Sequence, residues 1–150
     1  MSRINVGINP KALTDGHLLA DHREIKRICD LYNKRIQAGI NPITEGAPTK
    51  QTLGTGHMLF FIDKGHYTLR RYMDLNYECQ RRGFKVTYFG KSWETYWDKH
   101  FNNYEPTTED KAMLLERIAK RINESPKPYW HYCGEVVTKQ EACNILESLC

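Results

Sequence analysis

The sequence lacks several features that mark common classes of protein. No apolar run approaches the roughly 18 residues needed to cross a membrane, and the start, Met-Ser-Arg-Ile-Asn, lacks the apolar stretch of a secretory signal. The chain also has no internal repeat and no low-complexity tract. We therefore expect a cytoplasmic protein with no membrane partner.

Familiar catalytic and metal-binding motifs are missing as well. The chain has no P-loop, no glycine-rich dinucleotide fingerprint and no Ser/His/Asp order. Its five cysteines are odd in number and include no Cys-x-x-Cys pair, which argues against a disulfide framework or a zinc site. His131, Cys133 and Cys143 could in principle gather around a metal, but solvated or packed side chains are the simpler interpretation. We expect no metal and no cofactor.

What the sequence does contain is an ordinary globular composition with a small basic excess. Its 150 residues, 40% of them hydrophobic, suit one domain with one core. The net charge is +4, and the excess is concentrated: residues 64–85 carry six basic and two acidic residues, and residues 111–127 carry five and two. From charge alone, a nucleic-acid partner and ordinary solvated helix faces are equally good interpretations.

Apolar residues recur at helical spacing in four segments. The first segment follows an N-cap at Thr14 or Asp15, runs through Ile36 and is stopped by Gly39. The other segments cover the ranges 63–82, 107–123 and 138–149. Alternation typical of strands is not convincing anywhere, so the predicted fold class is all-α.

We predict a single compact domain over residues 1–150. It should have about three main helices with long connecting loops, and its N-terminal segment should pack near the first helix. Residues 136–150 are a candidate C-terminal extension of this domain.

The first predicted helix carries three kinds of surface. At about 100° per residue its apolar side chains share one face, and Arg23 and Arg27 fall on the opposite face. Glu24 lies on the flank between the two. Taken alone, Glu24 would be a surface carboxylate paired with Arg27 one turn away.

Five blocks of sequence, in a fixed order, carry a resemblance to a known family. The blocks are Met-Ser-Arg-Ile-Asn at the start, 13–18 with 23–27, 53–57 with 60–64, 78–84, and 118–121 with 130–134. Together they resemble the phage-type pyrimidine-dimer DNA glycosylases, the T4 endonuclease V family, over about residues 1–135. There are departures: Gly16 replaces a glutamine that helps hold DNA in the best-known member, and Cys133 replaces an aromatic residue.

The resemblance implies a DNA repair enzyme that recognises UV-induced cyclobutane pyrimidine dimers, cleaves the N-glycosidic bond and nicks the strand by β-elimination. It also implies that the nucleophile is the chain's own N-terminal amine. Because Ser2 is small, Met1 should be removed after synthesis, which leaves the α-amine of Ser2 as the terminus. An α-amine has a pKa of about 7.7–8.0, against about 10.4 for lysine, so a useful fraction is neutral and nucleophilic near pH 7.

The same resemblance implies roles for other residues. Glu24 would be the acid/base group that stabilises the cation-like sugar and shuttles a proton. The planar fork of arginine binds phosphate oxygens in pairs, and the expected phosphate clamps are Arg3, Arg23, Arg27, Arg117 and Arg121. The side chains expected to support the lesion site are His17, Tyr129, Trp130 and Tyr132. Structural packing is an almost equally good interpretation of these four rings.

Two alternatives to this function remain open at the level of the sequence. The chain could be a non-catalytic, basic, helical DNA-binding module, or a related glycosylase and lyase with a different lesion preference. In the main interpretation it is a monomer whose partner is double-stranded DNA that contains pyrimidine dimers or abasic sites. A phage- or virus-encoded protein within a host cell would fit that interpretation.

Overall fold

The computed structural model describes residues 4–43, 47–54 and 56–150. Its α-helices are α1 (Asp15–Glu24), α2 (Lys26–Gln37), α3 (Gly56–Phe61), α4 (Gly65–Arg81), α5 (Thr108–Glu124) and α6 (Lys139–Leu149). Short 3-10 helices are η1 (Pro10–Ala12), η2 (Gly90–Thr95) and η3 (Asp98–His100). Two antiparallel strands, β1 (Tyr129–Tyr132) and β2 (Glu135–Thr138), pair with Tyr129 opposite Thr138 and Tyr132 opposite Glu135.

The prediction of an all-α fold with about three main helices is wrong. The structure is 59% helical, but its described part contains six α-helices and a two-stranded sheet. The hairpin escaped the sequence analysis because each strand has only four residues, too few to establish an alternating pattern. Its two-residue loop, Cys133-Gly134, also differs from the Asn-Gly or Asp-Gly pairs that usually mark such a turn.

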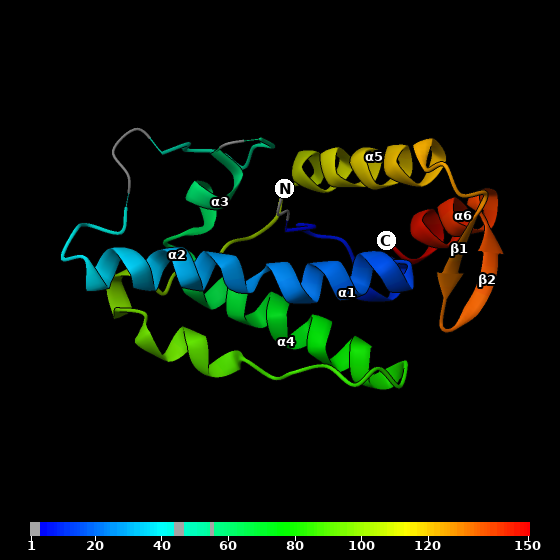
Figure 1. Ribbon diagram of the computed structural model, residues 1–150. Coiled ribbons are helices and arrows are strands. Elements are labelled where there is room, and N and C mark those ends of the chain that lie inside the picture. Colours follow the sequence, from blue (N-terminus) through cyan, green and yellow to red (C-terminus); the bar gives the residue numbers. More distant parts are fainter. Residues whose placement is uncertain (1–3, 44–46, 55) are drawn as a thin grey trace.

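The first predicted helix consists of two helices that run end to end (Figure 1). α1 begins after the Thr14 N-cap, whose Oγ1 accepts the backbone N–H of His17 at 3.2 Å, and it ends at Glu24. Ile25 keeps helical backbone angles, but the N–H of Ile28 bonds to its carbonyl at 3.3 Å, which is the tighter 3-10 pattern. Because position 25 holds neither proline nor glycine, the sequence did not mark this boundary. The break places Glu24 at the end of a helix.

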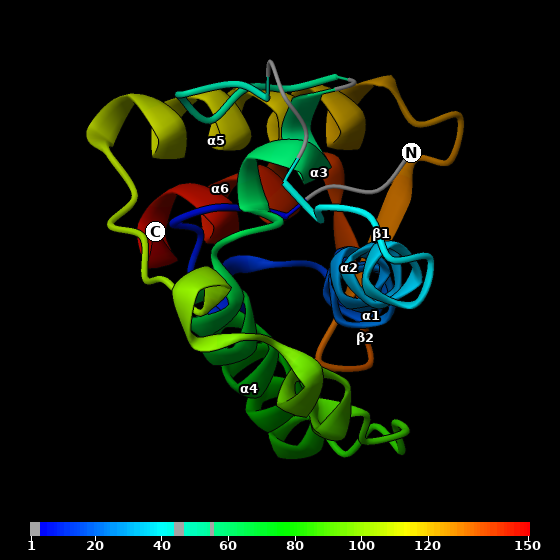
Figure 2. The ribbon, with the colours of Figure 1, turned by 90° about the vertical axis from the view of Figure 1, so that its left-hand side faces the viewer.

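The N-terminal segment is enclosed by helices. Figures 1 and 2 show α1 and α2 beside α4 on one side of this segment and α5 on the other, with α6 and the hairpin at one end of the molecule. Val6 and Ile8 of the segment are fully buried, as are Leu75 of α4 and Leu114 of α5. The segment is therefore part of the hydrophobic core, which fixes it between the helices.

The last helix, α6, also contributes to the core. It begins with a capping box formed by Thr138 and Glu141, in which each side chain bonds the backbone of the other residue. Ala142 and Leu146 are buried, and the helix packs against α5 and η1. The segment that the sequence marked as a candidate extension is thus in contact with the rest of the domain.

Candidate functional site

Three polar side chains lie along one face of α1. His17, Asp21 and Glu24 are spaced by four and three residues, which brings successive side chains to the same side of a helix. The distance from His17 to Glu24 along the axis is about 10 Å at 1.5 Å per residue. We call these three residues the α1 face, and each of them meets a different part of the molecule.

Glu24 is the accessible carboxylate of the α1 face. It ends α1 with 21% of its side chain exposed, whereas the side chain of Asp21 is fully buried. Oε1 of Glu24 lies 3.9 Å from Nη2 of Arg23, whose own side chain is 70% exposed. A contact this long and this exposed holds neither group firmly. Glu24 can therefore take part in other interactions at the protein surface.

Asp21 binds the N-terminal segment from inside the fold. Its Oδ2 accepts a hydrogen bond from Nδ2 of Asn5 at 3.0 Å and one from Nη2 of Arg71, on α4, at 3.1 Å. Arg71 also donates through Nη1 to the carbonyl of Ile8. Burial raises the pKa of Asp21, while the charge and hydrogen bonds of Arg71 and the hydrogen bonds of Asn5 oppose that shift. α1 and α4 together thus hold the segment at residues 5 and 8.

His57, near the start of α3, holds the same segment from another direction. Its Nε2 accepts the backbone N–H of Ile4 at 2.8 Å, and its Nδ1 donates to the carbonyl of Thr52 at 2.8 Å. The ring is fully buried and lies edge-on to Phe61, with centroids 5.4 Å apart. Residues 4 and 5 are therefore attached to two different buried groups.

The predicted nucleophile, Ser2, and one predicted phosphate clamp, Arg3, lie outside the described residues. The described chain that follows them leads directly to the α1 face, because Asn5 bonds to Asp21, one helical turn before Glu24. The structure thus brings the start of the described chain to the neighbourhood of Glu24.

His17 lies under an aromatic ring from the hairpin. The rings of His17 and Trp130 stack with centroids 4.8 Å apart and an interplanar angle of 25°, and Trp130 Nε1 donates to the carbonyl of Ile122 on α5 at 3.3 Å. Burial, together with the positive charges of Arg121 and Arg117, lowers the pKa of His17 to about 4. His17 is therefore neutral at physiological pH. At this end of the α1 face Trp130 stacks on His17, and the charges of two predicted phosphate clamps, Arg117 and Arg121, act on it.

The hairpin is attached to the start of α1 through Asp15. The Asp15 carboxylate accepts the backbone N–H of Cys133 at 2.9 Å and that of Gly134 at 2.8 Å. Both loop residues have positive φ angles, 50° and 82°, as a type I′ two-residue loop requires. Nη1 of Arg82 donates to the same carboxylate at 2.9 Å, and its guanidinium lies over the ring of Tyr132, 4.6 Å from the centroid. We call Asp15, Arg82 and the Cys133-Gly134 loop the hairpin clamp.

The other predicted aromatic residues of β1 point in two directions. Tyr132 shares a strand face with Trp130, but its hydroxyl donates to the carbonyl of Lys11 at 2.7 Å, so it is tied to η1 and to the hairpin clamp. Tyr129 lies on the opposite face of the strand and is exposed. The structure therefore joins Trp130 to the α1 face and places Tyr132 and Tyr129 elsewhere.

The arginines fall into two groups by exposure. Arg23 and Arg27, at the junction of α1 and α2, are exposed, and so is Arg121 on α5. Arg71 and Arg82 are buried in ion pairs with carboxylates of α1. Part of the basic excess of residues 64–85 is thus internal and cannot meet a partner, whereas α5 and the α1–α2 junction present theirs to solvent.

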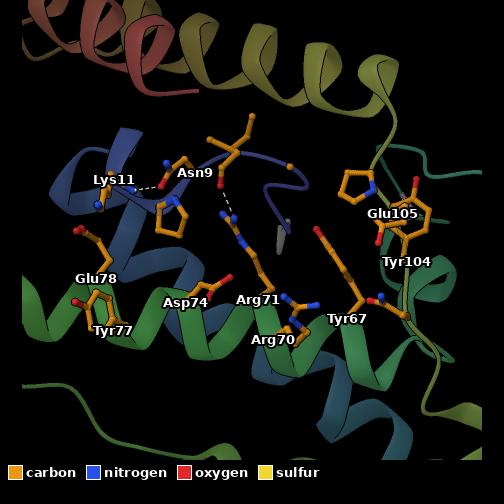
Figure 3. Close-up of a pocket in the computed structure, with 15 residues that line it drawn as sticks. Asn9, Lys11, Tyr67, Arg70, Arg71, Asp74, Tyr77, Glu78, Tyr104 and Glu105 are labelled. Carbon is orange, nitrogen blue, oxygen red and sulfur yellow. Dashed lines mark hydrogen bonds between the residues drawn. The ribbon is translucent and has the colours of Figure 1, made fainter.

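A cavity of about 550 Å³ lies between α4, the segment leading into η1 and residues 103–106, and Arg71 is one of its lining residues (Figure 3). Its lining mixes basic side chains, Lys11 and Arg70, with acidic ones, Asp74 and Glu105. None of the sequence-predicted site residues that the structure describes lines it. Figure 3 shows Arg71 reaching from α4 to the N-terminal segment beside this cavity.

The described ranges contain neither a metal-binding cluster nor a membrane-spanning helix. Within residues 4–43, 47–54 and 56–150, no group of three or more His, Cys, Asp or Glu side chains is placed to hold a metal ion. No helix in those ranges is both long and apolar enough to cross a lipid bilayer.

The sequence analysis missed three buried polar residues that shape this site: Asp15, Asp21 and His57. An acidic residue on an amphipathic helix is normally solvated, so nothing local marked Asp21 as buried, and Asp15 stood out only as an alternative N-cap to Thr14. His57 did leave a signal, because it stands directly before the apolar run Met-Leu-Phe-Phe of α3. A buried imidazole needs hydrogen-bond partners, so a histidine in such a run could have been singled out.

Comparison with known families agrees with this geometry. The pyrimidine dimer DNA glycosylase family matches residues 1–91, which is more than half of the chain. The matched range contains the whole α1 face, the segment attached to Asp21 and His57, and α4. The resemblance found in the sequence is thereby confirmed, and the chain belongs to the pyrimidine dimer DNA glycosylase family, which makes it a DNA repair glycosylase.

Proposed function

We propose that this protein recognises UV-induced cyclobutane pyrimidine dimers in double-stranded DNA, cleaves the N-glycosidic bond with the α-amine of Ser2, and nicks the strand at the resulting abasic site. The family membership supports the glycosylase step. The arrangement around the α1 face supports the identity of the reacting groups.

The reaction proceeds in two covalent steps. In the first, the Ser2 amine attacks C1′ of the damaged nucleotide, and the glycosidic bond breaks with its electron pair leaving on the base. The sugar ring opens to give a protonated Schiff base between the amine and C1′. In the second step, loss of the C2′ proton expels the 3′ phosphate by β-elimination, and hydrolysis of the imine frees the amine. The two steps together are redox-neutral and consume only water.

Glu24 suits the acid/base role in this scheme. A carboxylate beside C1′ stabilises positive charge on the sugar as the glycosidic bond breaks, and it can accept and return a proton. The side chain is half-buried, so it is partly shielded from water, yet its contact with Arg23 at 3.9 Å is loose. Asp21 could not replace it, because that carboxylate is fully buried and occupied by Asn5 and Arg71.

The observation that carries the proposal is the hydrogen bond between Asn5 and Asp21. Ser2 is three positions before Asn5 in the chain, and an extended chain of that length spans about 10 Å. Glu24 lies one turn from Asp21, where side chains on the same helix face have Cβ atoms about 5–6 Å apart. An amine at position 2 can therefore reach the Glu24 carboxylate while Asn5 stays in place.

The exposed arginines supply the affinity for DNA. Arg23 and Arg27 at the α1–α2 junction and Arg121 on α5 are exposed and would neutralise phosphates, together with Arg117 of α5, whose charge acts on His17. A pyrimidine dimer weakens base stacking, so kinking the duplex and extruding a base cost less there than in intact DNA. We expect the protein to act as a monomer on duplexes that contain dimers or abasic sites.

The test is reduction with borohydride during reaction with a duplex that contains one cyclobutane thymine dimer. Borohydride converts a Schiff base into a stable amine, so the enzyme should become covalently attached to the DNA. The matched control is the same chain with an acetylated N-terminus, which should bind the duplex and fail to crosslink. Cleavage by the acetylated chain at the rate of the free chain would rule out the terminal amine as nucleophile.

The same experiment separates the alternatives. Binding of the dimer duplex without any crosslink or nick would indicate a non-catalytic DNA-binding module. Crosslinking to a duplex with an oxidised or ring-opened base, but not to the dimer duplex, would indicate a related lyase with another lesion preference.

A further inference from the structure

His57 is a buried polar residue that the proposed reaction does not use. Its Nδ1 lies 2.8 Å from the carbonyl of Thr52, and its Nε2 lies 2.8 Å from the amide nitrogen of Ile4. The amide N–H of Ile4 can only donate, so Nε2 accepts and the ring proton is on Nδ1, which faces the Thr52 carbonyl and also lies 3.2 Å from the side-chain amide of Gln51. The imidazole thus connects the Thr52 carbonyl to the Ile4 amide through one hydrogen bond that it donates and one that it accepts.

The link acts close to the proposed nucleophile. Ser2 is two positions before Ile4 in the chain, and two residues of chain span at most about 7 Å. Whatever fixes the amide of Ile4 therefore limits the positions open to the α-amine. Free chain termini fray by default, and a frayed amine would spend little time beside C1′.

A second attachment gives the chain a direction. Ile4 is held through its backbone by His57, and Asn5 is held through its side chain by Asp21. One attachment would leave the chain able to swivel about that point. Two attachments on consecutive residues, one to the α3 side and one to α1, determine where the chain points.

We propose that His57 is a positioning residue that holds the Ser2 amine in reach of the sugar and of Glu24, through its hydrogen bond to the Ile4 amide. This inference rests on the proposed function of the amine. Its effect is on the rate of Schiff-base formation and not on DNA binding, because His57 is fully buried and cannot touch the DNA.

Two substitutions separate the contributions of the two imidazole nitrogens of His57. His57→Gln can keep an acceptor near the position of Nε2 for the Ile4 amide, whereas His57→Asn can keep only a donor near the position of Nδ1 for the Thr52 carbonyl. On a duplex with a preformed abasic site, His57→Asn should slow borohydride trapping about 100-fold, the loss typical of a reacting group misplaced by 1 Å. His57→Gln should recover most of that rate, and the Kd for the duplex should be the same in both variants.

A backbone change tests the link without altering the ring. Replacing Ile4 by its α-hydroxy acid puts an ester oxygen in place of the N–H and keeps the buried side chain. This ester variant should lose as much trapping rate as His57→Asn, and combining the two changes should cause no further loss, because both remove the same bond. In amide exchange, protection of the Ile4 N–H should be lost in His57→Asn and retained in His57→Gln.

The outcomes are distinct. Equal trapping rates for the Asn and Gln variants, whether both fast or both slow, would overturn the positioning role, as would an ester variant that traps like the wild type. If His57→Asn does not fold, the ester variant alone decides the question. A wild-type enzyme that forms no borohydride crosslink would overturn the proposed function and this inference with it. Normal crosslinking in the wild type, with the same rate in the His57 variants and the ester variant, would overturn this inference alone.

Discussion

Residues 1–91 and residues 92–150 supply different kinds of side chain to the candidate site around the α1 face. The first region, which matches the family, contributes Glu24 and the buried groups Asp21 and His57 that hold the N-terminal segment. The second region contributes Trp130 of the hairpin, which stacks on His17, and Arg121 of α5, whose positive charge lowers the pKa of His17. The first set is mostly buried and hydrogen-bonded, and the second is mostly at the surface.

This difference implies different roles for the buried polar groups and the exposed arginines. A buried polar group has few partners at fixed distances, so changing one atom leaves a neighbour unsatisfied and moves whatever it holds. An exposed arginine acts through charge, shares its task with other arginines and is screened by salt. We therefore expect changes in the buried polar groups to alter the rate of reaction and changes in the exposed arginines, in either region, to alter affinity. The following predictions are ordered by the size of the expected effect.

The largest effect is expected from Glu24→Gln, which keeps the shape of the side chain and removes its charge. Single-turnover nicking of a dimer duplex should fall by about 10²–10⁴-fold, the range typical of a lost acid/base group. Binding should be unchanged or tighter, because a negative charge near the phosphates is gone. Glu116→Gln, an exposed carboxylate on α5, is the control and should nick normally. Nicking by Glu24→Gln within about threefold of wild type would show that Glu24 is not the acid/base group.

The second prediction concerns the contribution of α6, within the second region, to the stability of the fold. Leu146 is buried and Leu149 is exposed on the same helix, so the pair tests burial with the same chemical change. Leu146→Ala should lower the free energy of unfolding by about 2–5 kcal/mol, as removal of a buried leucine usually does. Leu149→Ala should change it by no more than about 0.5 kcal/mol. Urea unfolding measures both, and equal values would mean that α6 does not belong to the cooperative core.

The third prediction concerns His17, which belongs to the first region but has its pKa set partly by the second. Its pKa is lowered from 6.5 to about 4, first by burial and then by Arg121 and Arg117. The unfolded chain therefore binds a proton between pH 6.5 and 4 that the folded chain does not. Stability should fall as the pH drops through this window, by about 3 kcal/mol in total, and should be fully restored above pH 6.5.

The control for this prediction must separate His17 from other histidines. Burial also lowers the pKa values of His22 and His100, so the wild type loses stability from more than one source. The quantity to measure is the difference in unfolding free energy between wild type and His17→Gln at several pH values. That difference should shrink steadily below pH 6.5, and a difference independent of pH would contradict the assignment.

The smallest effect is expected for single arginines. Arg121→Ala should weaken binding to dimer DNA by several-fold and should lower the slope of log K against log salt by about one unit. The rate of nicking by the bound enzyme should stay the same. Lys91→Ala is a matched control, because Lys91 is exposed on η2, which packs against α2 and α4. A loss of rate in Arg121→Ala without loss of affinity would break the proposed division between the buried polar groups and the exposed arginines.

The helices could be predicted where their ends carry local signals. The predicted range 63–82 corresponds to α4 at Gly65–Arg81, and 107–123 corresponds to α5 at Thr108–Glu124, which Thr107 and Asp110 start with a capping box. These ends depend on hydrogen bonds between residues three or four apart, which a sequence displays directly. α3 and the hairpin have no comparable signal, because their positions depend on contacts with distant parts of the chain.

The site was accessible from the sequence only in part. Glu24 and the arginines stood out because their spacing on a helix is local and because the family resemblance gave them roles. The partners of Asp21 and His57 could not be found in this way, since Asn5 lies 16 residues from Asp21 and Ile4 lies 53 residues from His57. Pairing across such distances is decided by the packing of α1, α3 and α4 around the N-terminal segment.

The hairpin clamp has a consequence for the order in which the molecule assembles. The loop amides of Cys133 and Gly134 are 118 and 119 residues away from the Asp15 carboxylate that binds them. During synthesis Asp15 and Arg82 emerge long before the loop does, and domains fold from the N-terminal side as the chain is made. Cys133 has a left-handed backbone conformation, which costs a non-glycine residue about 1–2 kcal/mol. The hydrogen bonds to the Asp15 carboxylate offset this cost, so the loop should be stable only once that carboxylate is in position. The hairpin should therefore dock only after α1 and α4 have formed, followed or accompanied by α6, which comes after it in the chain. The stacking of Trp130 on His17 should accordingly be among the late contacts to form.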